Sequence, residues 1–391
     1  MSSRLRNFAM PLVFLGVLLF AFAFGEVIPS SVKSFLYALS LSIKECLIFL
    51  LPFVIFSLVF CSISKLGAKA IRYVLIILPL VCCSNFVNTM LSYVISGASN
   101  VGVLPDAVQQ GSMALLPAFS FSLPPLISND IALFSGVTLG LFCGLSRLSL
   151  TEKLASALEG LSSVFFKILV PLMPLFVAGT ALKLQYDGVI SSIFERYFPI
   201  LLMFVASSYG LVLLQFFLLS GGRLSKTAQR IRNIIPALVT AFGSMSSAAA
   251  LPLSIKAAEQ NVSNAENARI IAPSTVNIHL VGDCFFIPMI AIAVMTSFGM
   301  DAPFFGTYVI FALHFVIAKF AVAAVPGGGV LVMLPIMQNY LGLSADMLAL
   351  VTALYILFDP LITTCNVAGN GAMAIVFDKV TGLLKPKASK Q

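Results

Sequence analysis

The 391-residue sequence contains no tryptophan, only two histidines and few charged side chains. Charged residues make up 10% of the chain, 59% of its residues are hydrophobic, and the mean hydropathy is +1.04. This scarcity of charge excludes an ordinary water-soluble domain and predicts a polytopic membrane protein. At about 20 apolar residues per crossing, the chain has room for roughly eight to ten membrane segments. Without tryptophan, any aromatic belt at the membrane surface must use tyrosine and phenylalanine.

Motifs for several other functions are also missing. The chain has no Gly-x-x-x-x-Gly-Lys-Ser/Thr loop for phosphates, which argues against ATP-driven transport. It has no Gly-x-Ser-x-Gly or His-Glu-x-x-His pattern, so an intramembrane enzyme, with a serine near position 246 as nucleophile and Lys319 as base, is the weaker alternative. The seven cysteines show no metal-ligand spacing and are expected to be small buried hydrophobes.

The net charge of +8 does not indicate nucleic-acid binding, because the basic residues fall in short loops between the predicted spans. Their distribution over these loops predicts the orientation of the chain in the membrane. A cytoplasmic N-terminus places most of these residues on one side, and also places the C-terminus there. A bacterial-type inner membrane is the expected location. The segment from Pro236 to Lys256 must then enter and leave from the cytoplasm as a re-entrant hairpin. The basic residues on the cytoplasmic side are Arg4, Arg6, Lys65, Lys69, Arg72, Arg147, Lys153, Arg223, Lys226, Arg230, Arg232, Lys385, Lys387 and Lys390.

The first half of the chain contains six predicted spans of ordinary kind. They run from Phe8 to Phe24, Cys46 to Ser62, Tyr73 to Ile95, Met113 to Leu145 (broken by prolines), Phe165 to Leu182 and Tyr197 to Leu219.

The second half differs because two stretches rich in small residues interrupt its apolar sequence, Gly243 to Pro252 and Ala323 to Gly329. At membrane depth such backbone is tolerated only where it is buried in protein or lines a cavity. Each stretch is followed by a segment that we predict to be a broken span, Ile270 to Phe298 and Met347 to Phe377. A hairpin followed by a broken helix, occurring twice, predicts an inverted repeat that holds a substrate between its halves.

Asp359 is the only acidic residue between Asp346 and Asp378 and lies in the middle of an apolar span. Ionisable residues inside membranes are usually functional, and a buried acid suits a substrate ammonium. The exposed N–H groups of hairpin tips suit a substrate carboxylate. Two plainer interpretations stay open: Asp359 caps a helix break beside Pro360, and Ser246 and Ser247 only allow close helix packing.

These segments resemble the dicarboxylate/amino acid:cation symporter family, which includes glutamate and neutral amino-acid transporters. The stretch from Ser246 to Pro252 resembles the tip of the family's first hairpin, and Val325 to Gly329 resembles the tip of its second. The resemblance is strongest over roughly the C-terminal 150 residues and extends to the first half only in hydropathy. The residues that match the eighth-span motif are Asp359, Thr363, Asn366, Val367 and Gly369.

The resemblance implies an all-α elevator-type transporter with eight transmembrane spans, two re-entrant hairpins and a homotrimeric assembly. Residues 1–72 would supply scaffold spans one and two, and residues 98–190 scaffold spans four and five. Residues 73–97 would supply core span three. Residues 191–391 would complete the transport core with span six, both hairpins and the last two spans.

The resemblance also implies a substrate site. Asp359 and Thr363 would face the amino group of an amino acid. Asn366 and the hairpin serines Ser246 and Ser247 would face its α-carboxylate. Val325 and Gly329 of the second hairpin tip would close the site from outside. No catalytic residue and no nucleic-acid partner is expected; the partners are the lipid bilayer and a small amino acid or related carboxylate.

Glutamate and aspartate carriers of the family place an arginine near the substrate's second carboxylate, whereas this chain has Pro360, Ile362 and Met245 at the corresponding positions. An unpaired buried anion is costly, so a substrate with a neutral side chain is favoured. The alternatives are a glutamate/aspartate or dicarboxylate:sodium symporter, a cation-independent exchanger, and a channel or sensor.

The coupling ion, sodium or proton, is left open, and no organic cofactor is expected. The family's Asn-Met-Asp-Gly-Thr motif reads His279 to Asp283 here, and the second sodium-binding acid becomes Asn370. Sodium prefers oxygen ligands with compensating charge, so the loss of these acids weakens the sodium sites. We hypothesise that Lys319 acts as a tethered cation while His279 and Asp283 exchange a proton. The alternative is that Lys319 extends to the membrane surface and His279 is a hydrogen-bonded core residue.

Overall fold

The computed structural model describes residues 9–64, 67–97, 115–123, 126–127, 129–146, 149–186, 190–322 and 327–383. Over these ranges the regular structure is helical and contains no strand. The prediction of an all-α fold is therefore confirmed. Among the described helices, three are long and apolar enough to cross a membrane: Leu75–Ser96, Tyr197–Leu219 and Ala345–Leu383.

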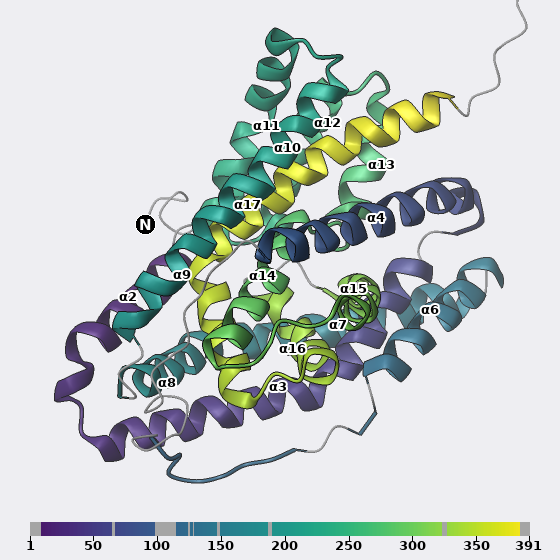
Figure 1. Cartoon of the computed structure of the whole chain (residues 1–391). Coiled ribbons are helices and arrows are strands. Elements are labelled where there is room, and N and C mark those ends of the chain that lie inside the picture. The colour runs from purple at the N-terminus through teal and green to yellow at the C-terminus, as the bar shows by residue number, and fades with distance from the viewer. Residues whose placement is uncertain are drawn as a thin grey trace, which may run out of the picture.

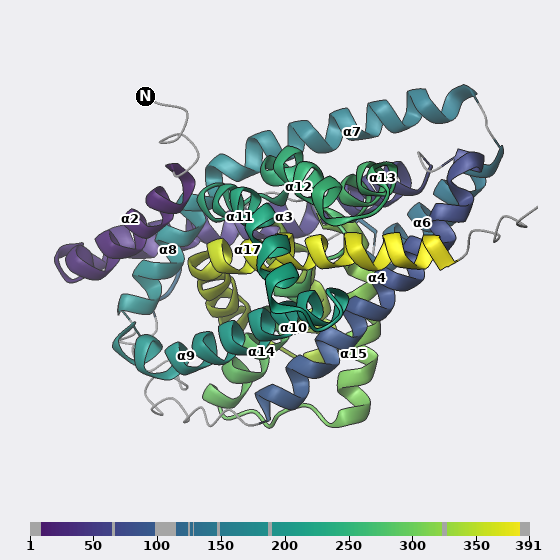
Figure 2. The ribbon, with the colours of Figure 1, turned by 90° about the horizontal axis from the view of Figure 1, so that it is seen from above.

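A first group of helices packs around the 35-residue helix α3. Helices α6, α7 and α8 each contact α3, and α2 packs against α8. Figure 2 shows α7 along one edge of the molecule, with α10, α14 and α15 toward the opposite edge. The group consists of α2 (Ala9–Phe24), α3 (Ser30–Ser64), α6 (Asn129–Ser146), α7 (Ser149–Leu169) and α8 (Met173–Tyr186), with short 3-10 turns at Gly25–Val27 and Val170–Leu172.

The predicted span from Phe165 to Leu182 is interrupted in this group. Helix α7 ends at Leu169, and a 3-10 turn precedes α8. Pro171 lies in that turn and has no N–H to donate to the preceding turn, which weakens the α-helix at this point.

A second group packs around α14 and α17. Helix α14 is buried along almost its whole length and contacts α4, α9 and α17, and helices α10–α13 pack against α17. The group consists of α4 (Gly67–Ser96), α9 (Ile190–Phe204), α10 (Gly210–Leu219), α11 (Leu224–Ser244), α12 (Ser247–Asn261), α13 (Ala265–Thr275), α14 (Val281–Ser297), α15 (Phe305–Ala318), α16 (Gly328–Leu341) and α17 (Ala345–Leu383), with a π-helical segment at Val205–Tyr209 and a 3-10 turn at Lys319–Ala321.

Two pairs of packed helices belong to the second group. Helices α11 and α12 meet at Met245, which has a left-handed backbone with φ of 51°, and the Ser246 hydroxyl caps α12 by accepting the N–H of Ala249 at 3.3 Å. Helices α15 and α16 form the other pair, and Gly327, with φ of 72°, precedes α16. Figure 1 shows α11 and α12 toward the top of the molecule and α15 and α16 near its centre, close to α14.

The two predicted helix breaks have different outcomes. The predicted break between Ile270 and Phe298 is present, since residues 276–280 separate α13 from α14. The predicted break between Met347 and Phe377 is wrong, because α17 is one helix of 39 residues. Pro360 removes a single backbone hydrogen bond, and the buried side chains along α17 stabilise the helix on both sides of it.

Candidate functional site

Buried polar side chains gather where the start of α14, the middle of α17 and the helix pair α15–α16 meet. The ion pair between Asp283 and Lys319 is the strongest feature. Asp283 lies in the first turn of α14, and its Oδ2 is 2.9 Å from Nζ of Lys319 at the end of α15. The two side chains are 1% and 0% exposed. Each charge has the sign that its helix end favours.

Phe315 adds a second contact to the Lys319 ammonium, whose nitrogen lies 4.5 Å from the ring centroid of Phe315. Such a cation–π contact stabilises a desolvated cation. A lysine that is 0% exposed and paired in this way does not extend to the membrane surface. The alternative interpretation of Lys319 as a lysine that reaches the surface is therefore wrong.

The second oxygen of Asp283, Oδ1, accepts two hydrogen bonds from α17. One comes from the Tyr355 hydroxyl and one from the Asn366 amide, both at 3.1 Å. The amide oxygen of Asn366 accepts the backbone N–H groups of Gly282 at 2.8 Å and Asp283 at 3.3 Å. Asn366 therefore joins the N-terminus of α14 to α17, and both ends of its amide are hydrogen-bonded within the protein.

Gly329 approaches the same carboxylate from α16. A Cβ atom at this position would collide with Oδ2 of Asp283 and with the Tyr355 hydroxyl. Only glycine lets the backbone of α16 come this close. Lys319 and Gly329 belong to opposite arms of the α15–α16 pair, so both arms contact Asp283.

Asp359 is a second buried carboxylate and is 2% exposed. Its Oδ2 accepts the backbone N–H of Gly327 at 2.9 Å, and its Oδ1 accepts the Thr363 hydroxyl at 2.7 Å. No basic side chain is paired with it in the described part of the chain. Because Asp359 lies inside the continuous helix α17, the interpretation that it caps a helix break is wrong.

His279 lies in a separate set of hydrogen bonds and is 2% exposed. Its Nδ1 is 3.0 Å from Oδ1 of Asn370, and its Nε2 is 2.8 Å from the Ser84 hydroxyl. A neutral imidazole that carries its proton on Nδ1 satisfies both contacts. Asn85 also binds this segment, donating to the carbonyl of Ile278 at 2.7 Å and accepting the N–H of Leu280 at 3.3 Å. Helix α4 thereby holds the non-helical residues 276–280.

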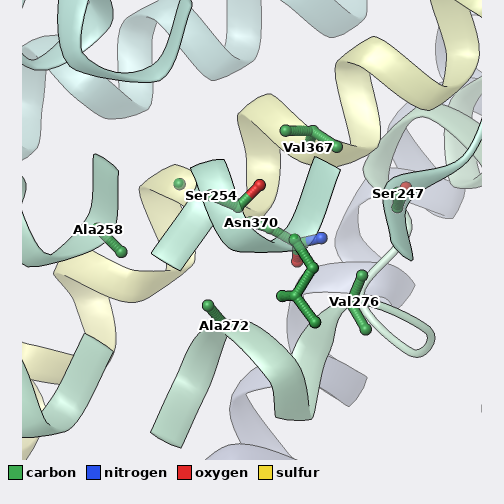
Figure 3. A pocket seen from close by; sticks show the side chains of 9 residues that line it. Ser247, Ser254, Ala258, Ala272, Val276, Val367 and Asn370 are labelled. Carbon is green, nitrogen blue, oxygen red and sulfur yellow. The ribbon is translucent and has the colours of Figure 1, made fainter. Parts of the chain in front are cut away.

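A small pocket, part of it open to solvent, lies between α12, α13 and α17. Ser247, Ser254, Val276 and Asn370 are among its lining residues, and Figure 3 shows side chains from the three helices converging on it. Neither Asp283 nor Asp359 lines this pocket.

The predicted site residues thus divide among several places. Asp359 and Thr363 lie together. Asn366, which was expected to face a substrate carboxylate, contacts Asp283 instead, as does Gly329. Ser246 caps α12, Ser247 lines the pocket with Asn370, and His279 and Asp283 have separate hydrogen-bond partners. Val325 lies outside the described residues.

Sequence reasoning missed three residues that organise the site, Tyr355, Ser84 and Asn85. Tyr355 precedes Asp359 by four positions, which places both on one helix face. Ser84 and Asn85 begin a polar series in the otherwise apolar span from Tyr73 to Ile95. The spacing of these residues by three or four was the available signal. The members of the series are Ser84, Asn85, Asn88, Thr89 and Ser92.

The cysteines are free thiols. Cys61, Cys284 and Cys365 are buried, as expected, whereas Cys83 is exposed. Within the described ranges, no group of three or more His, Cys, Asp or Glu residues is placed to hold a metal ion.

An apolar helical chain with ionisable groups buried at helix ends has the character of a membrane transporter. Residues 10–380 match the model of the "Sodium:dicarboxylate symporter family", and the chain belongs to this family. The predicted resemblance is confirmed, and the family and the relatives are transporters rather than enzymes.

Relatives with similar sequences support the same family. The chain is 28% identical to "Excitatory amino acid transporter 1" of Rattus norvegicus over 156 residues, which are 39% of this chain and 28% of the relative. It is 31% identical to "Neutral amino acid transporter B(0)" of Homo sapiens over 141 residues, 35% of this chain and 25% of the relative. The matched stretches thus span less than a third of each of these relatives.

Proposed function

We propose that this chain is a secondary transporter of small neutral amino acids. The observation that carries the proposal is the state of Asp359, a buried carboxylate with two hydrogen-bond donors and no basic partner among the described residues. A buried anion without a cation is unfavourable, and a substrate ammonium would compensate it. Asp283 does not need such a partner because Lys319 already neutralises it.

A neutral substrate side chain is favoured because the positions expected to carry arginine are apolar. Ile362 is 0% exposed and Met245 is 1% exposed. Lys319, the buried cation of this region, is engaged by Asp283. A second substrate carboxylate would therefore lack a counter-charge, which disfavours glutamate, aspartate and dicarboxylates. One of the relatives carries the name of a neutral amino-acid transporter.

Transport is proposed to follow an elevator mechanism in a homotrimer, in a bacterial-type inner membrane with both termini in the cytoplasm. The helix packing supports a scaffold of residues 1–72 and 98–190, since α2, α3, α6, α7 and α8 pack chiefly on one another. A core of residues 73–97 and 191–391 is supported by the packing of α4 and α9 against α14 and of α10–α14 and α16 against α17. The two packed helix pairs, α11–α12 and α15–α16, suit the proposed pair of re-entrant hairpins (Figure 1).

Uptake by purified protein in liposomes tests the proposal. Radiolabelled alanine, serine, leucine, glutamate, aspartate and succinate are offered separately, with sodium and proton gradients imposed one at a time. Saturable uptake of one or more neutral amino acids, with a strongly raised KM in the Asp359→Asn variant, is the expected result. Uptake restricted to glutamate, aspartate or succinate would overturn the proposal, as would neutral uptake that is unaffected by Asp359→Asn.

A further inference from the structure

We propose that Lys319 is a built-in cation that does the work of a bound sodium ion: its ammonium neutralises Asp283 and holds both arms of the α15–α16 pair against α14. The inference deepens the proposed transport function by assigning how closure of this helix pair is stabilised. Its central test, sodium binding by the purified protein, does not depend on which substrate is carried.

The contacts of Asp283 leave little for a dissolved cation to bind. Oδ2 is paired with the Lys319 ammonium at 2.9 Å, and Oδ1 accepts hydrogen bonds from Tyr355 and Asn366 at 3.1 Å. The backbone of Gly329 closes over Oδ2 so tightly that a Cβ would collide with it. A sodium ion at this carboxylate would have to displace an ammonium that is already desolvated and paired.

The surrounding charges lead to the same conclusion. The positions where the family resemblance expects sodium-binding acids hold Val281, which is 0% exposed, and Asn370, whose amide oxygen faces His279. Asp359 is the other acid of the site, and the proposed function assigns it to the substrate ammonium. Sodium binds oxygen ligands that carry compensating charge, and within the described ranges no group of three or more His, Cys, Asp or Glu residues is placed to hold a metal ion. The residues present therefore do not fit the family's sodium.

The ion pair also has a mechanical effect. Lys319 ends α15, Gly329 lies in the first turn of α16, and both meet the Asp283 carboxylate on α14. Neutralising Asp283 thus brings the two arms together on α14 at one point. Because the cation is covalently attached at the C-terminal end of α15, this closure does not require an ion from solution.

Thermal unfolding of the purified protein in sodium chloride, compared with choline chloride at equal ionic strength, tests the inference. Wild-type protein is expected to have the same Tm in both salts. The Lys319→Ala variant leaves Asp283 buried without a cation, so its Tm is expected to be lower in choline and to rise saturably with sodium concentration, as linkage to a bound ligand requires. Lys379→Ala, which removes an exposed lysine, is the matched control and should respond like wild type.

The double variant Asp283→Asn, Lys319→Met removes both charges and keeps the test decisive if Lys319→Ala does not fold. The Tm of this double variant is expected to be the same in sodium chloride and in choline chloride. A saturable rise of the wild-type Tm with sodium that the double variant loses would overturn the inference, as would a folded Lys319→Ala protein whose Tm ignores sodium. Absence of uptake in liposomes, with the expected Tm pattern intact, would count against the proposed substrate and not against the built-in cation.

Discussion

The backbone N–H of Gly327 donates a hydrogen bond of 2.9 Å to the carboxylate of Asp359. This bond joins the entrance of α16 to the middle of α17. Under the proposed function, the same carboxylate would meet a substrate ammonium as well as the α15–α16 pair. Substrate binding and the position of this helix pair would then be coupled through one acidic group.

Replacing Asp359 by asparagine should weaken substrate binding strongly. The amide keeps the size of the side chain but loses the charge that attracts an ammonium, and charge-assisted hydrogen bonds contribute about 1.5–3 kcal/mol, or roughly tenfold to hundredfold in affinity. The KM for uptake in liposomes measures the effect. Glu266→Gln, an exposed acid, is the control. Equal KM values for the two variants would contradict the role of Asp359.

Replacing Gly329 by alanine should destabilise the closed helix pair. The added methyl group overlaps Asp283 and Tyr355, and overpacking of this kind costs about 1–3 kcal/mol. Gly306→Ala is the matched control, because it lies in the partner helix α15 with open space around its Cβ position. Thermal unfolding should show a lower Tm for Gly329→Ala only. A Tm that is lowered equally in both variants would contradict the close approach.

The charges of Asp283 and Lys319 should depend on each other for stability. Removing one partner of a buried ion pair typically costs about 3–5 kcal/mol, whereas replacing both by uncharged groups is often nearly neutral. A double-mutant cycle with Asp283→Asn and Lys319→Met, measured in choline chloride, should give a double variant more stable than either single variant. Additive losses would show that the two charges act independently.

Asn85 should be required to hold the non-helical segment before α14. Asn85→Ala leaves the carbonyl of Ile278 and the N–H of Leu280 without their partner, and each unsatisfied buried group costs about 1–3 kcal/mol. Val87→Ala, on the exposed side of the same helix, should cost much less. Hydrogen exchange at residues 276–280 gives a local measurement. Unchanged protection in Asn85→Ala would contradict the anchoring role.

The elevator proposal predicts a contact that breaks during transport. Nζ of Lys183, in the proposed scaffold, lies 3.5 Å from Oδ1 of Asp346 at the start of α17 in the proposed core, and the Tyr37 hydroxyl is also 3.5 Å from this oxygen. Asp346 is half-exposed, so the pair contributes at most about 1 kcal/mol. Asp346→Asn should raise the rate at which labelled substrate exchanges across the liposome membrane by up to about fivefold. Asp301→Asn is the exposed control. An unchanged rate would argue against core movement relative to α8.

Much of the fold could be predicted from the sequence because a membrane requires long apolar helices and tolerates irregular backbone only where it is buried in protein or lines a cavity. Apolar length predicted long apolar helices from Tyr73 to Ile95 and from Tyr197 to Leu219, close to the observed Leu75–Ser96 and Tyr197–Leu219, and small residues predicted the turn at Met245. The break at Pro360 was predicted wrongly, since a single proline removes one hydrogen bond and the packing around α17 outweighs that loss.

The site was harder to predict because its pairings are long-range. The acid Asp359 stood out in an apolar segment, and its neighbour Thr363 lies one turn away. The partnership of Asn366 with Asp283 instead of a substrate joins residues 83 positions apart, and no local pattern specifies it. The need for glycine at position 329 likewise could not be read from local sequence, because it arises from the close approach of α16 to Asp283 on α14.

Because α17 is one continuous helix, it fixes the spacing of the polar residues of the whole site. Its polar residues follow at intervals of four, four, three and four, so they lie along one face over about 22 Å at 1.5 Å per residue. Inserting a single residue after Tyr355 would turn everything beyond it by about 100° around the helix axis. The contacts around Asp283, Asp359 and His279 therefore all depend on the same rotation of α17, and none can shift along the helix without the others. The residues of this face are Tyr355, Asp359, Thr363, Asn366 and Asn370.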